Sequence, residues 1–437
     1  MKKSSKSVWS RFVMTFAAAF LLMLVTTVPV KADSSNMPLV KDIKQTDAST
    51  NSVGIIWSCP GSDIRFKIET SEQLSTGYTD YNKRPQSSAS VTLTKLGAGK
   101  VYYVRITPIR YTMEGIGKYT TVTGTTSQPF RVVTAPDSAP ASLTHVKSST
   151  DTIKVKWSAV PGADVYQVVY SQSGTANEFT KETTGTSVTL KNLSKDARYT
   201  IKVRAGKKYT DGTGRAWGNY HTKYDVPVKS TKVEGIKVSG YYQNLSKISI
   251  TNKAKACADG YQYQLYTAYK GQDKETKVKS ITVNQNNPGS SNQVSASMKI
   301  SALKNHNFYK VRVRAYSLNS KNEKIYGVWS SWKYVSPQPD VTKIKNNKSK
   351  KGIQISWDKI KGANRYVVYV STKKDSGYKK FQTTTKTGTV IKKCGKNKLK
   401  SGKNYYFYVE PQKKVGNKYV SGLAGNANYC WSLKYKK

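Results

Sequence analysis

The chain has 437 residues and a formal net charge of +48, from 73 lysine and arginine residues against 25 aspartate and glutamate residues. A chain of this length exceeds a single hydrophobic core and is expected to divide into several domains. Three histidines, sparse carboxylates and the lack of a glycine-rich phosphate loop argue against metal-dependent, histidine-based and glycosidic catalysis. We therefore expect a protein that is not an enzyme and that uses no cofactor and no metal.

The first 32 residues have the features of a signal peptide. A basic start precedes an apolar run at positions 12–30, which leads into Val30-Lys31-Ala32. This order of regions predicts cleavage after Ala32 and export of the mature chain. The run is about long enough to span a bilayer, so an uncleaved anchor is the alternative. Thr26, Thr27 and Pro29 dilute its apolar character and favour removal.

A leucine followed six residues later by a tyrosine occurs four times, about a hundred residues apart. After the tyrosine, apolar residues alternate with polar ones, as in Tyr199, Ile201 and Val203. This alternation predicts a strand with one buried face. The tyrosine is placed to return its hydroxyl to the preceding loop. The four pairs are Leu96 and Tyr102, Leu193 and Tyr199, Leu303 and Tyr309, and Leu399 and Tyr405. Four copies predict four tandem domains.

A tryptophan ends an apolar strand upstream of three of these pairs, at Trp57, Trp157 and Trp357, whereas Asn252 holds that place in the third copy. A tryptophan on the second strand, with leucine and tyrosine around the sixth, resembles the fibronectin type III module. The resemblance implies an all-β chain of tandem immunoglobulin-like antiparallel β-sandwiches. It implies little about function, because one fold serves many functions.

Four modules follow from these repeats: residues 37–134 (module 1), 140–229 (module 2), 232–335 (module 3) and 340–437 (module 4). Module 3 is divergent, because it lacks the tryptophan and carries an insertion near residues 270–297. The linkers are short and contain proline, as in Ala135–Pro140, and therefore predict an extended array.

Positive charge rises toward the C-terminus. Residues 33–135 hold 12 basic and 8 acidic residues, whereas residues 341–437 hold 25 basic and 3 acidic ones. The simpler interpretation is that these basic residues form a solvated face with no specific partner. The sharper interpretation is retention on anionic polymers such as teichoic acid or acidic polysaccharide. The candidate binding residues are Lys343, Lys345, Lys350, Lys351, Lys373, Lys374, Lys379, Lys380, Lys392, Lys393, Lys398 and Lys400. No motif for specific nucleic-acid binding is present.

Aromatic residues form a second candidate site. Tyr326, Trp329 and Trp332 lie between the expected sixth and seventh strands of module 3, where they could contact sugar rings. The alternative is that these rings pack over the sandwich edge or the joint between modules.

Histidines and cysteines give no clear site. His145 and His221 are expected to lie far apart within module 2, and His306 belongs to module 3. Four cysteines are too few for a disulfide framework. A bond between Cys394 and Cys430 stays open, although their expected strands belong to opposite sheets.

Three functions compete. The first is a non-catalytic, secreted protein for surface binding or adhesion, associated with the cell wall of a Gram-positive bacterium and held by its basic C-terminal half. Its partners would be anionic wall polymer or acidic polysaccharide, with a protein or glycan ligand presented by the loops. The second is a structural spacer, and the third is an accessory protein of an extracellular polysaccharide-degrading system.

Overall fold

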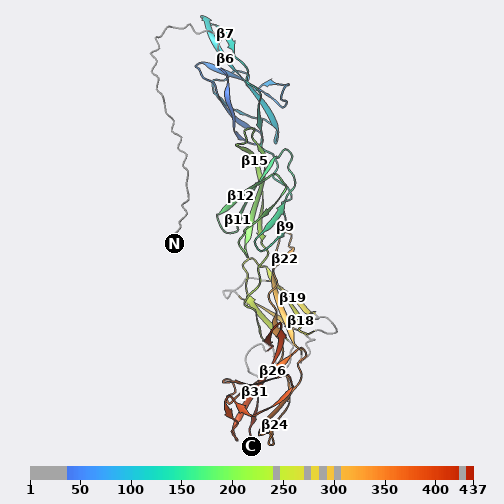
Figure 1. Cartoon of the computed structure of the whole chain (residues 1–437). Helices are drawn as coiled ribbons and strands as arrows, with labels where there is room; N and C mark the ends of the chain where they lie inside the picture. Colours follow the sequence, from blue (N-terminus) through green and yellow to red (C-terminus); the bar gives the residue numbers. More distant parts are fainter. Residues whose placement is uncertain (1–36, 240–246, 270–276, 285–292, 300–306, 423–429) are drawn as a thin grey trace, which may run out of the picture. The chain divides into compact units, whose positions relative to one another are not determined.

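The computed structural model describes residues 37–239, 247–269, 277–284, 293–299, 307–422 and 430–437 (Figure 1). Every regular element in these ranges is a β-strand, and the strands pair antiparallel into sheets. The prediction of an all-β chain of tandem antiparallel sandwiches is confirmed. The predicted signal peptide, Leu303 and His306 lie outside the described residues.

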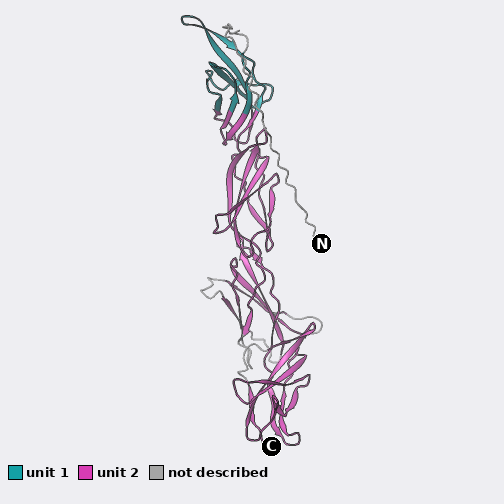
Figure 2. Cartoon of the chain, turned by 60° about the vertical axis from the view of Figure 1, so that its left-hand side comes forward, with its two compact units in different colours: residues 1–43, 56–91, 103–130 teal, residues 44–55, 92–102, 131–437 magenta. Residues whose placement is uncertain are grey.

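The chain divides into two compact units, drawn in teal and magenta in Figure 2. Unit 1 comprises residues 1–43, 56–91 and 103–130, and unit 2 comprises residues 44–55, 92–102 and 131–437. The dividing line passes through module 1, so several of its strands have residues in both units.

Module 1 contains one sheet in the order β1-β2-β5 and one with the path β4-β3-β6-β7. Its strands are β1 (Lys41–Ala48), β2 (Val53–Ser58), β3 (Ile64–Ser71), β4 (Thr79–Asp80), β5 (Ser90–Leu93), β6 (Val101–Gly115), β7 (Lys118–Thr123) and β8 (Phe130–Val133). Ile64, Phe66 and Ile68 alternate along β3 and are buried, as period-two patterning requires. The hairpin of β6 and β7 continues beyond this core.

Module 2 shows how alternation builds the sandwich. Its strands are β9 (Thr144–Ser148), β10 (Ile153–Lys156), β11 (Val165–Gln172), β12 (Glu178–Thr183), β13 (Ser187–Leu190), β14 (Arg198–Lys208) and β15 (Arg215–Pro227). The sheets have the orders β13-β10-β9 and β12-β11-β14-β15. Val155 on β10, Val168 on β11 and Val203 on β14 are fully buried in one cluster. Each such side chain contributes about 1.5–3 kcal/mol through the hydrophobic effect.

Module 3 has the same two-sheet arrangement, with the order β16-β17-β20 and the path β19-β18-β21-β22, to which β23 adds by pairing with β21. Its strands are β16 (Lys237–Ser239), β17 (Lys247–Lys253), β18 (Gly260–Thr267), β19 (Lys277–Asn284), β20 (Gln293–Lys299), β21 (Tyr309–Leu318), β22 (Lys324–Tyr326) and β23 (Lys333–Val335). Asn252, at the tryptophan position, is buried, and its Oδ1 accepts a hydrogen bond of 2.6 Å from the Tyr263 hydroxyl.

Module 4 adds a small hairpin to the two sheets. Its strands are β24 (Val341–Asn347), β25 (Gly352–Trp357), β26 (Arg365–Ser371), β27 (Lys379–Thr384), β28 (Gly388–Ile391), β29 (Lys393–Cys394), β30 (Asn397–Lys398), β31 (Asn404–Val415), β32 (Lys418–Ser421) and β33 (Trp431–Lys434). One sheet is β24-β25-β28, the other follows β27-β26-β31-β32 with β33 on β31, and β29 pairs with β30. Lysines of both β27 and the hairpin are exposed.

The tyrosines of the repeated motif are buried and return their hydroxyls to the preceding loop. The hydroxyls of Tyr102, Tyr199 and Tyr405 accept hydrogen bonds of 2.7, 2.7 and 2.8 Å from the backbone N–H of the residue after the motif leucine. Leu193 is buried, and Leu96 and Leu399 are half-buried. In module 3, the Tyr309 hydroxyl accepts a hydrogen bond from the Asn307 side chain.

A second repeat, which the sequence analysis missed, lies nine residues after the tryptophan position. Trp57, Trp157 and Trp357 are buried, and their ring centroids lie 5.2–5.6 Å from those of Phe66, Tyr166 and Tyr366. The hydroxyls of Tyr166, Tyr261 and Tyr366 each accept a hydrogen bond of 2.7–2.9 Å from the loop after the second strand. The spacing was visible in the sequence, but the hydroxyl's backbone partner could be identified only from the fold.

Candidate polyanion-binding surface

The twelve candidate lysines of module 4 are all exposed. Residues 341–437 carry only Asp358, Asp375 and Glu410 as acidic counterparts. Among the described residues, none of the twelve lysines forms an ion pair with a carboxylate. Their positive charge is therefore available to an external anion.

Four lysines gather where β27 meets the β29–β30 hairpin, and we call Lys379, Lys393, Lys396 and Lys398 the lysine cluster. Lys393 and Lys398 are directly paired across the hairpin. The turn runs through Gly395 and Lys396, and the φ of 61° at Gly395 is a left-handed conformation that glycine adopts without strain. A Cβ on Gly395 would lie 2.8 Å from Cδ of Lys379, so the Lys379 stem crosses over the turn.

Like charges directly opposite one another on a hairpin destabilise it. The opposed charges of Lys393 and Lys398 therefore do not stabilise this hairpin. The thiol of Cys394 is influenced by one of these lysines. Burial raises the pKa of this thiol, and the positive charge of Lys379 opposes that rise.

Part of the lysine pattern has a structural explanation. Lys343 and Lys345 lie on β24, and Lys379 and Lys380 lie on β27, which are end strands in their sheets' pairing orders. Lysines on edge strands hinder unwanted pairing with another chain. β29 and β30 form a separate two-stranded sheet, so both are edge strands and the same explanation extends to Lys393 and Lys398.

The aromatic candidates of module 3 are placed in a stack with cationic side chains. The guanidinium carbon of Arg314 lies 3.7 Å from the ring centroid of Tyr326 and 4.4 Å from that of Trp329. Arg312 follows, 4.2 Å from Trp329 and 4.7 Å from Trp332. The order Tyr326, Arg314, Trp329, Arg312, Trp332 is completed by Lys310, 4.3 Å from the last ring.

Glutamines of β18 fix this stack. Gln264 accepts hydrogen bonds of 3.0 and 2.8 Å from Arg312, and Gln262 accepts one of 2.7 Å from Arg314. Cation–π contacts at exposed sites are worth about 0.5–1 kcal/mol each. Because two guanidinium groups lie against Trp329, this ring is engaged within module 3. The arrangement matches the alternative in which these aromatic residues pack over the sandwich edge.

The expected separation of the two histidines of module 2 is wrong. His145 and His221 line one cavity of about 350 Å³ together with Lys223 and Lys321. They lie on β9 and β15, which are end strands in the pairing orders of the two sheets, and stacking of the sheets brings these strands together. Burial lowers the pKa of His145, and the charge of Lys223 adds to this effect.

Other candidate chemistry can be stated only for the described part of the chain. Within it, no group of three or more histidine, cysteine or acidic residues could hold a metal ion. Cys59, Cys257, Cys394 and Cys430 are free thiols. No helix in the described ranges is long and apolar enough to cross a membrane.

A comparison with known protein families gives a match within module 2. Residues 138–218 match the model of the fibronectin type III domain family. This match covers most of module 2, the module in which the tryptophan, leucine and tyrosine of the motif are all buried.

Longer similarities cross module boundaries. Chitinase A1 of Niallia circulans is 28% identical over 192 residues, which are 41% of this chain and 24% of the relative. Neogenin of Rattus norvegicus is 27% identical over 235 residues, 50% of this chain and 16% of the relative. The chain thus spans a quarter or less of these curated relatives. Among solved structures, the FN1–FN3 domains of chicken CNTN1 align at 19% identity with a TM-score of 0.26, over 69% of this chain and 99% of that one.

Proposed function

We propose that this is a non-catalytic, secreted binding protein of the bacterial surface, retained on anionic cell-wall polymers by the lysines of module 4. The observation that supports this most directly is the lysine cluster, where exposed like charges are held together without a carboxylate partner among the described residues. A wall polymer of a Gram-positive bacterium, with repeated phosphate or carboxylate groups, would supply the missing negative charge.

Lysine suits such a partner. Its ammonium group is a point charge on a flexible stem, so it attracts anions without demanding one fixed geometry. Binding of this kind weakens with salt, because the screening length falls from about 10 Å at 0.1 M to about 3 Å at 1 M. The remaining modules would present loops to a protein or glycan ligand.

The test compares two variants of the full mature chain that lose the same charge. The first carries Lys379→Gln, Lys393→Gln, Lys396→Gln and Lys398→Gln. The second removes four exposed lysines of module 2, through Lys147→Gln, Lys156→Gln, Lys191→Gln and Lys195→Gln. Binding to purified teichoic acid is measured in 0.1 M and 1 M sodium chloride.

We expect the module 4 variant to bind roughly tenfold more weakly at 0.1 M salt, as for the loss of several ionic contacts. The module 2 variant should change much less, and 1 M salt should release both. Equal losses in the two variants would show that only net charge matters, and salt-resistant binding would remove charge as the mechanism.

A second candidate function is an accessory role in an extracellular polysaccharide-degrading system. The similarity to chitinase A1 of Niallia circulans favours it. This role predicts binding to a neutral polysaccharide that persists in high salt, which separates it from retention by lysines.

A further inference from the structure

The β6–β7 hairpin of module 1 exposes several large apolar side chains. Tyr111 is 42% exposed, Met113 61% and Tyr119 60%, and Ile116 at the tip is fully exposed. Tyr111 pairs with Thr121, and Met113 pairs with Tyr119, so these four residues share one face of the hairpin. Outward strand positions are usually polar, so this face needs an explanation.

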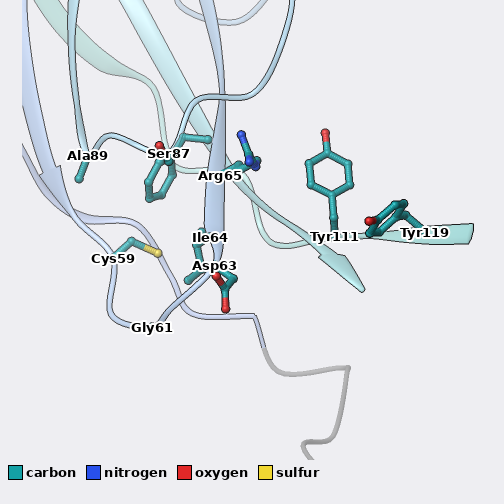
Figure 3. Close-up of a pocket in the computed structure, with 10 residues that line it drawn as sticks. Cys59, Gly61, Asp63, Ile64, Arg65, Ser87, Ala89, Tyr111 and Tyr119 are labelled. Carbon is teal, nitrogen blue, oxygen red and sulfur yellow. The ribbon is translucent and has the colours of Figure 1, made fainter. Parts of the chain in front are cut away.

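The same face borders a cavity of about 840 Å³ (Figure 3). Tyr111 and Tyr119 line it from the hairpin, and Arg65 lines it from β3. Asp63 lies in the loop before β3, and Ser87 lies in the loop before β5. All lining residues belong to unit 1. The cavity therefore combines two tyrosine rings with hydrogen-bonding groups.

The loop that carries Asp63 is held in an uncommon backbone conformation. Gly61 has a φ of 122°, and Asp63 has a φ of 59° in the left-handed region. These two positions turn the chain sharply between β2 and β3 and bring Asp63 to the wall of the cavity. The cavity wall is thus built from this turn, from strands β3, β6 and β7, and from the connection between β4 and β5.

The two tyrosines differ from the tryptophans of module 3. Arg65 is the cation found near Tyr111, and its guanidinium carbon is 6.0 Å from the ring centroid, much farther than the 4.2 Å between Arg312 and Trp329. For Tyr119, no ring or cation contact is found among the described residues. These rings therefore remain open to a flat partner, whereas Trp329 is covered by two guanidinium groups.

We call the exposed hairpin face of Tyr111, Met113 and Tyr119 the tyrosine face. We propose that this face and the cavity beside it bind a neutral polysaccharide chain. A pyranose ring has apolar C–H faces that pack on aromatic rings and hydroxyl groups at its edge. Tyr111 and Tyr119 offer the ring surfaces, while Asp63 accepts and Arg65 donates hydrogen bonds to hydroxyls. The charges of Asp63 and Arg65 balance locally, which fits an uncharged chain better than a polyanion. This site is independent of the lysines of module 4.

The experiment uses the full mature chain and insoluble chitin, cellulose and β-1,3-glucan in 1 M sodium chloride, where attraction through lysines is screened. Depletion of protein from solution measures binding. The test variant carries Tyr111→Ala and Tyr119→Ala. The matched control is Tyr224→Ala, which removes a tyrosine that is 70% exposed in module 2. Tyr119→Phe keeps the ring and removes only its hydroxyl.

We expect the native chain to bind at least one of these polysaccharides in 1 M salt. The double variant should lose at least tenfold in affinity with an unchanged circular dichroism spectrum, whereas Tyr224→Ala and Tyr119→Phe should bind like the native chain. Failure of the native chain to bind any of the three, equal binding by the double variant, or an equal loss in Tyr224→Ala would overturn the proposal. Teichoic acid binding in 0.1 M salt would be unaffected by each of these outcomes, so the two proposals fail separately.

Discussion

Modules 2 and 3 fill the same place in the sandwich in different ways. In module 2, the Trp157 ring packs 5.5 Å from that of Tyr166, and its indole N–H is buried without a hydrogen-bond acceptor among the described residues. In module 3, Asn252 takes that position and is hydrogen-bonded to Tyr263, which is fully buried. The core must be filled at this position. The indole ring of Trp157 fills it in module 2, and Asn252 together with Tyr263 fills it in module 3.

The two solutions depend on different forces. Module 2 relies on the apolar area of Trp157 and tolerates an unpaired N–H, which costs about 1–3 kcal/mol. Module 3 buries two polar groups, and these are tolerated because they satisfy each other. Substitutions that remove volume should therefore be most harmful in module 2, and substitutions that remove one hydrogen-bonding partner should be most harmful in module 3.

The largest effect is expected for Trp157→Ala. Truncating a buried large aromatic residue leaves a cavity and costs about 3–5 kcal/mol. Urea unfolding of the full chain, with hydrogen exchange of β10, β11 and β14 to assign the transition, measures this loss. Tyr224→Ala at an exposed site of the same module is the control. If the exchange of these strands is unchanged in Trp157→Ala, the ring does not support the core.

High pH should weaken module 3 through Tyr261. Burial raises the pKa of this hydroxyl from 10 to about 12, although a hydrogen bond from the Lys255 backbone N–H opposes the rise. The neutral ring is favoured in the folded state, so its contribution is complete below pH 10 and is lost as the pH rises toward 12. The full loss corresponds to about 3 kcal/mol.

Urea unfolding of the full chain at pH 9 and pH 11.5 tests this expectation. Tyr261→Phe cannot ionise, so the stability of module 3 should change less between the two pH values in this variant than in the native chain. An identical pH dependence in both chains would assign the alkaline loss to other groups, such as Tyr263, whose pKa burial also raises.

Tyr263→Phe should separate hydrogen bonding from volume. The ring stays, but the side-chain oxygen of Asn252 loses its donor inside the core, which costs about 1–3 kcal/mol. The double variant Asn252→Leu and Tyr263→Phe removes both polar groups and should recover part of this loss, as a double-mutant cycle would show. Additive losses in the cycle would mean that the hydrogen bond does not couple the two residues.

The alternation after each motif tyrosine was enough to predict the strands, because period-two burial depends on local sequence. The tandem sandwiches were predicted through the resemblance of the tryptophan, leucine and tyrosine motif to the fibronectin type III module. The cation–π stack was not predicted, since it needs β21 to place Lys310, Arg312 and Arg314 opposite a segment some twenty residues away. The pairing of Lys393 with Lys398 depends on a two-residue turn at Gly395, which the sequence analysis did not recognise. The tyrosine face of module 1 was missed because exposure of Tyr111 and Tyr119 depends on how far the hairpin extends beyond the core.

The smallest effect is expected at the motif tyrosine of module 2. Tyr199→Phe keeps the buried ring and removes the acceptor of the 2.7 Å hydrogen bond from the Ser194 backbone N–H. This bond is partly exposed, so water can replace the hydroxyl and the cost should be about 1 kcal/mol. Tyr170→Phe is the matched control in the same module, because no hydrogen bond of its hydroxyl is found among the described residues. Urea unfolding should place Tyr199→Phe below Tyr170→Phe, with a slope that matches the native chain. If the two variants unfold at the same urea concentration, the buried ring, rather than its hydroxyl, holds the loop against the sandwich.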